Sequence, residues 1–248
     1  MRASLISFTF LLAATVLLVS GCGGCSTGYQ QVDGKWAYVT INTGAGRSVN
    51  YIEGADQETF EVLAEDIYAK DKNRVYYRSN PIPNADAETF RVLQDQQYYP
   101  YAKDKTHVFL TDWVVQDADP DTFEPITFPY ARDRSNVYCG TFRLPVDNVD
   151  AFKILKGSGS TVGDRAGIDG KGWSTDGVSV FYGRKSVPGV DVATFQALSE
   201  IYGKDRQHVY YHDRVVPLAD PATFKTTGYI TGEDKNRRFS MDKPIPKR

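Results

Sequence analysis

The sequence predicts an α+β fold, rich in β-strands and built from tandem units of about 30 residues. Three observations lead to this prediction. A pattern Asp-Lys/Arg-x-x-Val-Tyr/Phe recurs along the chain, a Phe usually follows its Asp after 19 residues, and an Asp typical of a helix start lies between the two. The copies of the pattern open at Asp33, Asp71, Asp104, Asp133, Asp176, Asp205 and Asp234.

Residues 1–21 are predicted to be a signal peptide. Arg2 precedes an apolar stretch over residues 5–19, and small residues then precede Cys22. So short an apolar stretch with a cleavage-like end is typical of secretion rather than of a membrane span. The sequence Val19-Ser20-Gly21-Cys22 resembles the bacterial lipobox. That resemblance implies a lipoprotein, in which acyl chains such as palmitate on Cys22 hold the protein at the membrane surface.

The composition predicts a folded domain over residues 33–248, preceded by a lipid anchor and flexible linker over residues 22–32. Aromatic residues make up 13% of the chain, which argues against disorder beyond the linker. The net charge of -2 provides no basic field, so nucleic acid is not an expected partner. Three cysteines do not form a disulfide framework, and a bond between Cys25 and Cys139 is left open but is not favoured.

The first element of each unit is predicted to be a β-hairpin. With the opening Asp as position 0, position +5 is aromatic in all seven copies and position -3 is aromatic in five. Aromatic and β-branched residues on both sides of a short polar turn are typical of a hairpin. The residue at -3 then lies opposite +5 or +6, and the sequence leaves this register open. The repeated Asp and Lys/Arg are interpreted as solvated turn residues.

An extended piece and a short helix are predicted to complete the unit. The extended piece carries an aliphatic residue and then a Pro, as in Val216-Pro217, which suits a strand end or edge. Asp220-Pro221 then combines a favoured N-cap with a favoured first helical residue. An apolar residue three positions after the Phe, such as Leu198 after Phe195, predicts a helix of about two turns.

Stacking of the units is expected, because a single hairpin is at best marginally stable in water. We therefore predict an open repeat array. A closed propeller-like ring is the alternative, because the sequence begins and ends part-way through a unit.

These repeats resemble the DKNYY family, whose motif is matched by Asp71-Lys72-Asn73 and Tyr76-Tyr77. The resemblance covers roughly residues 33–248. It implies a bacterial envelope or secreted protein with tandem motifs, and it implies no defined activity and no catalytic residues.

One interval between copies is longer than its neighbours and marks a candidate site. Asp133 and Asp176 are 43 residues apart, where the flanking intervals are 29. The surplus, at about residues 156–172, holds six Gly together with Asp164, Arg165 and Asp169. A long loop on a rigid scaffold is a reasonable binding site, although a tolerated surface insertion is the simpler interpretation.

Known cofactor and metal motifs are not matched. The Gly-rich stretch at residues 157–160 lacks the Gly-Lys-Ser/Thr ending of a phosphate-binding loop. Asp117, Asp119 and Asp121 mimic the start of a calcium loop, but the required Gly is missing. His107 and His208 share one repeat position, which indicates repetition rather than a metal site. We expect no cofactor and no metal.

A second candidate site consists of tyrosines at position +6. Consecutive residues of a strand face opposite sides, so Tyr77, Tyr182 and Tyr211 would form a stripe opposite the core. If this stripe is exposed, its rings are suited to stack on sugars. The simpler interpretation is that the helical turn of each unit covers it.

Together these observations predict a non-enzymatic, lipid-anchored protein with a binding or structural role. Its expected location is the bacterial cell envelope, on the periplasmic or extracellular face, and at the outer membrane if the host is Gram-negative. Its expected partners are the membrane, through Cys22, and a protein or cell-wall glycan. The alternatives are a glycan- or peptidoglycan-binding module that uses the exposed tyrosines and, less favoured, an enzyme with its site at the Gly-rich insertion.

Overall fold

The computed structural model describes residues 27–63, 66–93, 100–156, 162–164 and 167–246, which consist of β-strands, turns and short connections. The strands form antiparallel sheets, which we label A to H. Sheet A has three strands, sheet F has two, and each of the other sheets has four. The four-stranded sheets are meanders whose strands pair in chain order, except that β17 and β18 are inserted between β16 and β19 of sheet E.

The strands of the first four sheets precede the insertion. Sheet A contains β1 (Gly28–Val32), β2 (Lys35–Asn42) and β3 (Gly46–Tyr51). Sheet B contains β4 (Glu61–Val62), β5 (Tyr68–Lys70), β6 (Val75–Tyr77) and β7 (Asn80–Pro81). Sheet C contains β8 (Arg91–Val92), β9 (Tyr101–Lys103), β10 (Val108–Leu110) and β11 (Trp113–Val114). Sheet D contains β12 (Glu124–Thr127), β13 (Tyr130–Arg132), β14 (Val137–Cys139) and β15 (Phe142–Arg143).

The remaining strands form sheets E to H. Sheet E contains β16 (Lys153–Lys156), β19 (Trp173–Thr175), β20 (Val180–Tyr182) and β21 (Lys185–Ser186). Sheet F contains β17 (Val162–Asp164) and β18 (Gly167–Asp169). Sheet G contains β22 (Gln196–Ala197), β23 (Tyr202–Lys204), β24 (Val209–Tyr211) and β25 (Arg214–Val215). Sheet H contains β26 (Lys225–Thr226), β27 (Thr231–Glu233), β28 (Arg238–Ser240) and β29 (Lys243–Ile245).

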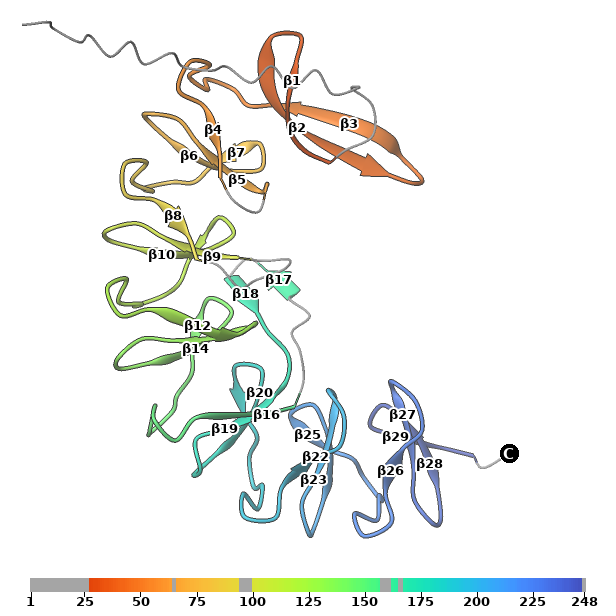
Figure 1. Cartoon of the computed structure of the whole chain (residues 1–248). Helices are drawn as coiled ribbons and strands as arrows, with labels where there is room; N and C mark the ends of the chain where they lie inside the picture. The colour runs from red at the N-terminus through yellow and green to blue at the C-terminus, as the bar shows by residue number, and fades with distance from the viewer. Residues whose placement is uncertain (1–26, 64–65, 94–99, 157–161, 165–166, 247–248) are drawn as a thin grey trace, which may run out of the picture.

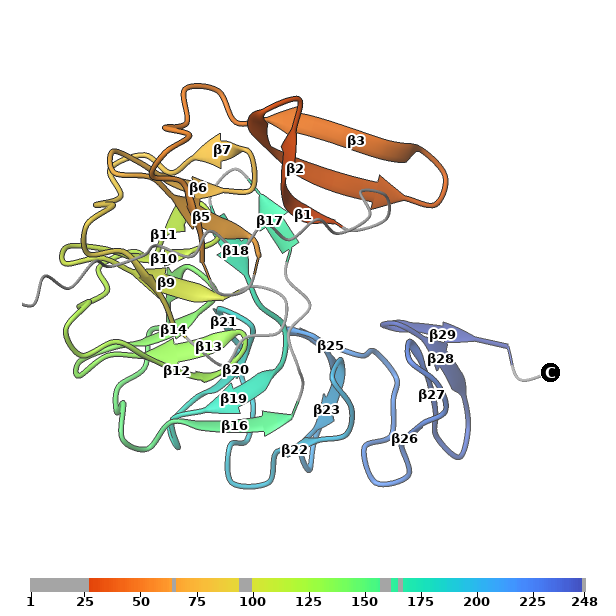
Figure 2. The ribbon, with the colours of Figure 1, turned by 45° about the horizontal axis from the view of Figure 1, so that its top comes forward.

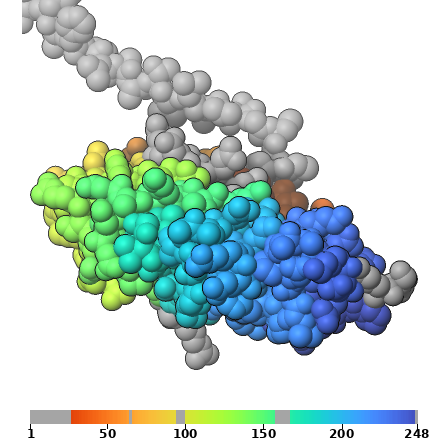
Figure 3. Space-filling view, turned by 90° about the horizontal axis from the view of Figure 1, so that it is seen from below, coloured from red at the N-terminus to blue at the C-terminus, as the bar shows by residue number. Residues whose placement is uncertain are grey.

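The sheets form an open, curved row rather than a closed ring (Figure 1). Sheets A and H lie at its two ends, and β17 and β18 lie on the inner side of the curve (Figure 2). From below, the second half of the chain forms one continuous body in which the sheets follow each other in chain order (Figure 3). Among the described residues, each sheet of the row therefore packs against the sheets beside it in chain order. The inserted hairpin is the exception.

The predicted hairpin is present, and its register is now defined. Tyr68 pairs with Tyr77 across β5 and β6, and Tyr202 pairs with Tyr211 across β23 and β24. The aromatic residue at -3 therefore lies opposite position +6, not +5. The residue at +7 begins the turn to the next strand and has a positive φ even where it is not Gly, as at His212 (φ 54).

Six of the seven signature aspartates are buried, so their interpretation as solvated turn residues is wrong, and only Asp33 is exposed. At Asp71, Oδ1 accepts the backbone N–H groups of Asn73 and Arg74, both at 2.8 Å, which closes the hairpin turn. Oδ2 accepts the N–H of Asp56 at 2.9 Å, from the connection that precedes sheet B. One carboxylate thus fixes both its own turn and the connection between sheets. The six aspartates that share this arrangement are Asp71, Asp104, Asp133, Asp176, Asp205 and Asp234.

The α+β prediction is wrong, because the described residues contain no helix. The Asp220 segment does begin a helical turn, in which Phe224 donates its N–H to the Asp220 carbonyl at 3.0 Å. The turn ends there, and β26 begins at the next residue. Leu198 donates instead to the Tyr202 carbonyl, as expected of a strand partner. A first helical turn is costly to form and gains little without extension, whereas extended backbone here gains ladder bonds at once.

The Phe at position +19 fills the space between successive sheets. Phe90 contacts Tyr68 of sheet B and Phe109 of sheet C, with ring centroids 5.4 and 5.7 Å apart. Phe224 makes the equivalent contacts to Tyr202 and Phe239. Aromatic pairs at such distances contribute about 0.5–1.5 kcal/mol beyond their buried area. The core is therefore a series of aromatic layers between sheets, and it is not a single central core.

The aromatic residue at -3 also bonds to the following sheet. The Tyr101 hydroxyl donates to the carbonyl oxygens of Pro129 and Gly140, at 3.0 and 2.8 Å. In sheet E this position is Trp173, whose indole N–H donates to the Ser199 carbonyl at 3.1 Å. These bonds satisfy carbonyl groups where the ladders end, and they fix the spacing from one sheet to the next.

Candidate functional site

The predicted site residues lie in different environments. Tyr77 is half-buried on β6, whereas Tyr182 and Tyr211 are only 7% and 6% exposed. The condition for an exposed tyrosine stripe is therefore not met at Tyr182 and Tyr211. Asp169 ends β18, while Cys22, Arg165 and the side chain of Asp164 lie outside the described residues.

The described part of the Gly-rich insertion packs into the core, so it is not the tolerated surface insertion of the simpler interpretation. Ile168 on β18 is 6% exposed and belongs to the apolar cluster of Tyr101 and Tyr138. Its carbonyl accepts the N–H of Thr141 at 2.8 Å, and its own N–H donates to the Thr141 hydroxyl at 2.9 Å. These bonds attach the insertion to the turn between β14 and β15.

Glycine allows this close approach at two points. A Cβ at Gly140 would overlap the carbonyl oxygen of Ile168, and a Cβ at Gly170 would overlap the ring of Pro129. Gly140 also has a φ of 65, which favours glycine. The glycine at position 170 of the insertion therefore reflects close packing of its backbone against the side chains of Pro129 and Cys139 rather than a flexible linker.

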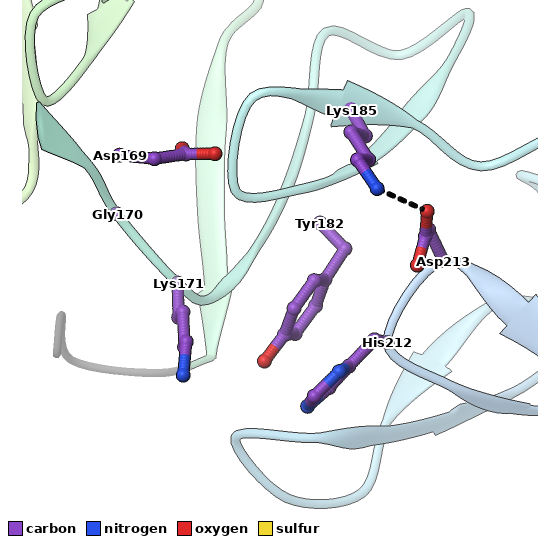
Figure 4. A pocket seen from close by; sticks show the side chains of 7 residues that line it. All are labelled: Asp169, Gly170, Lys171, Tyr182, Lys185, His212 and Asp213. Carbon is purple, nitrogen blue, oxygen red and sulfur yellow. Dashed lines mark hydrogen bonds and ion pairs between the residues drawn. The ribbon is translucent and has the colours of Figure 1, made fainter. Parts of the chain in front are cut away.

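The return of the insertion forms a pocket where sheets E and G meet (Figure 4). Its volume is about 150 Å³. Three segments contribute: the chain after β18, strands β20 and β21 of sheet E, and the turn between β24 and β25 of sheet G. The residues that line it are Asp169, Gly170, Lys171, Tyr182, Lys185, His212 and Asp213.

Ion pairs compensate most charges around the pocket. Lys185 Nζ lies 3.0 Å from Asp213 Oδ2, a pair that is visible in Figure 4. Arg184 Nε lies 3.0 Å from Asp169 Oδ2, and its guanidinium carbon lies 3.9 Å from the Phe142 ring centroid. The second pair therefore orients one oxygen of Asp169 and leaves the other for a different partner.

Two buried polar atoms of the pocket have no hydrogen-bond partner in the described part of the chain. They are Oδ1 of Asp169 and the hydroxyl of Tyr182. Figure 4 shows the Tyr182 hydroxyl directed between the Lys171 ammonium and the His212 ring. Burial raises the pKa of Asp169, against the opposing effect of Arg184, and burial also raises the pKa of Tyr182. Polar groups that are buried without partners are rare in folded proteins and call for an explanation.

The ring of His212 forms one wall. It stacks between Tyr182 and Tyr211, at centroid distances of 4.5 and 4.2 Å and interplanar angles of 17° and 24°. Burial and the nearby Lys171 lower the pKa of His212 to about 4. The imidazole is therefore neutral near pH 7, and it presents a flat polar surface rather than a cation.

The structure thus joins Asp169 and Tyr182 in one site and brings Tyr211 to its edge. Tyr77 lies in sheet B, where Arg78 covers its ring, and takes no part in this pocket. Sequence reasoning placed Lys171 within the candidate insertion without assigning it a role, and it missed His212. The sequence does offer an indication of His212, because the two preceding units have glycine, Gly140 and Gly183, at the same turn position.

Other site classes find no support in the described residues. These residues contain no group of three or more His, Cys, Asp or Glu side chains arranged to hold a metal ion. Cys139 is a free, fully buried cysteine whose pKa is raised by burial, and Cys25 lies outside the described ranges. Within the same ranges, no helix is long and apolar enough to cross a membrane.

Comparison with known proteins identifies one family. The model of the DKNYY family matches residues 15–113, 68–214 and 101–243, which together span most of the sequence. No curated protein and no solved structure matches the chain.

Proposed function

The chain belongs to the DKNYY family, and we propose that it is a non-enzymatic, lipid-anchored protein of the bacterial cell envelope with a binding or structural role. The observation that carries the proposal is the use of the repeated polar side chains. The signature aspartates accept bonds that join adjacent sheets, so the motif that defines the repeat serves to assemble the row. Specific binding then belongs to the places where the repeat is interrupted.

The threonine that precedes the repeat Phe in most units also serves to join the sheets. Thr89 donates from its hydroxyl to Asp86 at 2.7 Å and accepts the backbone N–H of Lys105 at 3.1 Å. Lys105 Nζ in turn lies 2.8 Å from Asp86 Oδ2. The Asp, Lys and Thr of the repeat are thus engaged with one another between sheets.

The lipid anchor rests on the sequence at Cys22. One acyl chain binds a bilayer only marginally, whereas two or more chains hold a protein stably. An acylated Cys22 ahead of β1 would therefore keep the row at the surface of a membrane. The periplasmic or extracellular face is the proposed side, with the outer membrane as the location in a Gram-negative host.

Acylation is testable in a bacterial host with a clickable palmitate analogue. The full chain should incorporate the label and sediment with membranes, and Cys22→Ala should lose both properties. Cys25→Ala is the matched control and should retain both. Labelling of Cys22→Ala, or membrane sedimentation of an unlabelled chain, would contradict the anchor.

The non-enzymatic part of the proposal has its own test at the pocket. A turnover measured with any substrate, and abolished by Asp169→Asn while the variant still folds, would refute it. Asp112→Asn is a suitable control, because this aspartate lies in the turn between β10 and β11 of sheet C and outside the pocket.

A further inference from the structure

We propose that the pocket between the insertion and sheets E and G binds a small amino or hydroxy carboxylate. Such a ligand carries a hydrogen-bond donor at one end and a carboxylate at the other. The inference rests on the proposed binding role and specifies the chemistry of the ligand. It follows from the unpaired polar atoms, the charges and the size of the pocket.

Two complementary polar groups define the ends of the ligand. Asp169 Oδ1 is buried with no partner in the described residues, and an ionised carboxylate only accepts hydrogen bonds. It therefore requires a donor such as an ammonium or a hydroxyl. The Tyr182 hydroxyl, on a side chain only 7% exposed, has no partner there either, and it can donate to an anionic oxygen.

The charge balance favours an anion beside Tyr182. Lys185 is paired with Asp213, and Arg184 with Asp169, while His212 is neutral near pH 7. The ammonium of Lys171 remains: it lines the same pocket and lies close enough to His212 to lower the pKa of that ring. A carboxylate placed between the Lys171 ammonium and the Tyr182 hydroxyl would balance the remaining positive charge and form charge-assisted hydrogen bonds.

The pocket also limits the size of the ligand. Its volume is about 150 Å³, and a cavity of this size holds a molecule of about six non-hydrogen atoms, as benzene does in an engineered case. Alanine and lactate have this size and carry both required groups.

The site exists only where the repeat is interrupted. Tyr77 and Tyr211 occupy the repeat position of Tyr182, but neither hydroxyl is among the buried polar atoms left unpaired in the described residues. The difference arises because Asp169 and Lys171 come from the insertion, which no other described unit has. The pocket is therefore an addition to the scaffold and not a by-product of its repetition.

The test is calorimetric titration of the full chain, solubilised in a mild detergent, with four probes near pH 7. Alanine and lactate carry both groups, propionate lacks the donor, and ethylamine lacks the carboxylate. We expect alanine or lactate to bind at least tenfold more tightly than propionate and ethylamine. Binding of neither, or equal binding of all four, would overturn the proposal.

Variants then locate the binding to the pocket. Tyr182→Phe and Asp169→Asn should each weaken binding at least tenfold, whereas Tyr77→Phe should leave it unchanged. Tyr182→Phe removes a buried unpaired hydroxyl, so its melting temperature without ligand should equal or exceed that of the parent. A lower melting temperature with unchanged affinity would assign the hydroxyl a structural role and refute the proposal.

The result of these titrations does not depend on whether the protein carries the lipid anchor. If the titrations fail while Cys22 is acylated, the anchored scaffold stands and only the ligand site is lost. If acylation fails while the probes bind, the pocket stands without the proposed location.

Discussion

The substitution Asp133→Asn tests whether the signature carboxylates hold the row together. Oδ1 of Asp133 accepts the N–H groups of Ser135 and Asn136, both at 2.7 Å. Oδ2 accepts the N–H of Asp119 at 3.0 Å and the hydroxyl of Tyr138 at 2.6 Å. Both oxygens thus face donors only. An amide placed here directs its NH₂ either at the two backbone N–H groups or at the Asp119 N–H and the Tyr138 hydroxyl, which can then donate to the Asp117 carbonyl instead.

The structure gives the expected size of this effect. Each buried donor left unpaired costs about 1–3 kcal/mol, and the loss of the Tyr138 bond to the carboxylate adds to the cost of the unpaired Asp119 N–H, so Asp133→Asn should lower the free energy of unfolding by about 3 kcal/mol. Asp176→Asn is the internal comparison, because Phe181 replaces the tyrosine there and Oδ2 accepts only the Asp147 N–H. Its expected cost is about 2 kcal/mol when the amide NH₂ faces that single donor.

The assay is equilibrium unfolding in urea, followed by tyrosine and tryptophan fluorescence. Burial raises the pKa of Asp133, but hydrogen bonds from Tyr138 and from backbone N–H groups outweigh it and hold the pKa below its ordinary value. A lowered folded-state pKa stabilises the protein above the unfolded pKa of about 3.9, and this contribution is lost as the pH falls through the folded value. The difference in the free energy of unfolding between the parent and Asp133→Asn should therefore become smaller below about pH 4.

The control is Asp121→Asn, at an exposed position of the connection before β12, which should change stability by less than about 0.5 kcal/mol. A loss below about 1 kcal/mol for Asp133→Asn at pH 7 would contradict the proposed role of the carboxylate. A difference in the free energy of unfolding that stays constant on acidification would contradict the same role.

Three further predictions concern other parts of the row. Tyr101→Phe removes the donor to the carbonyls of Pro129 and Gly140 and should cost about 1–3 kcal/mol in the same urea assay; no change would mean that other donors satisfy these carbonyls. Leu218 is 66% exposed with a φ of 65, so Leu218→Gly should relieve left-handed backbone strain and stabilise by about 0.5–1 kcal/mol, measured by thermal melting; a lower melting temperature would contradict this reasoning. Cys139 is fully buried with a raised pKa, so its reaction with a thiol reagent should follow unfolding in urea, and rapid labelling of the folded protein would be inconsistent with its burial.

The hairpins were predictable because their pattern has the period of a strand. Aromatic residues at -3 and +5 flank a polar turn, and this pattern is copied often enough to stand out from chance. The helix prediction failed at Asp220-Pro221, where N-cap chemistry closes a single turn and Phe224 is then held between sheets. Local capping signals start a turn, but the packing of the next residues decides whether a helix continues.

The candidate site was only half predictable from the sequence. The irregular interval pointed to Asp169, and the strand period pointed to Tyr182. Their meeting with Lys171 and His212 depends on how the insertion folds back over the row, a long-range contact that no local pattern contains. The burial of Tyr182 was unpredictable for a similar reason, because it depends on a contact between sheets. His212, in the turn after Tyr211, stacks against both Tyr182 and Tyr211.

The bonds between sheets also give the row a direction. Each sheet contributes an aromatic residue that donates to the next one, beginning with Tyr29, whose hydroxyl bonds the Ile67 carbonyl at 3.0 Å. In sheet H, the last of the described residues, the same repeat position is Thr231, and its short side chain bonds the Thr227 hydroxyl of its own sheet at 3.1 Å. A sheet without the aromatic donor cannot form the bond that places a further sheet in register. The aromatic residue at this position is therefore one of the contacts that join successive sheets, together with the Phe and the Asp contacts made by the connections between them.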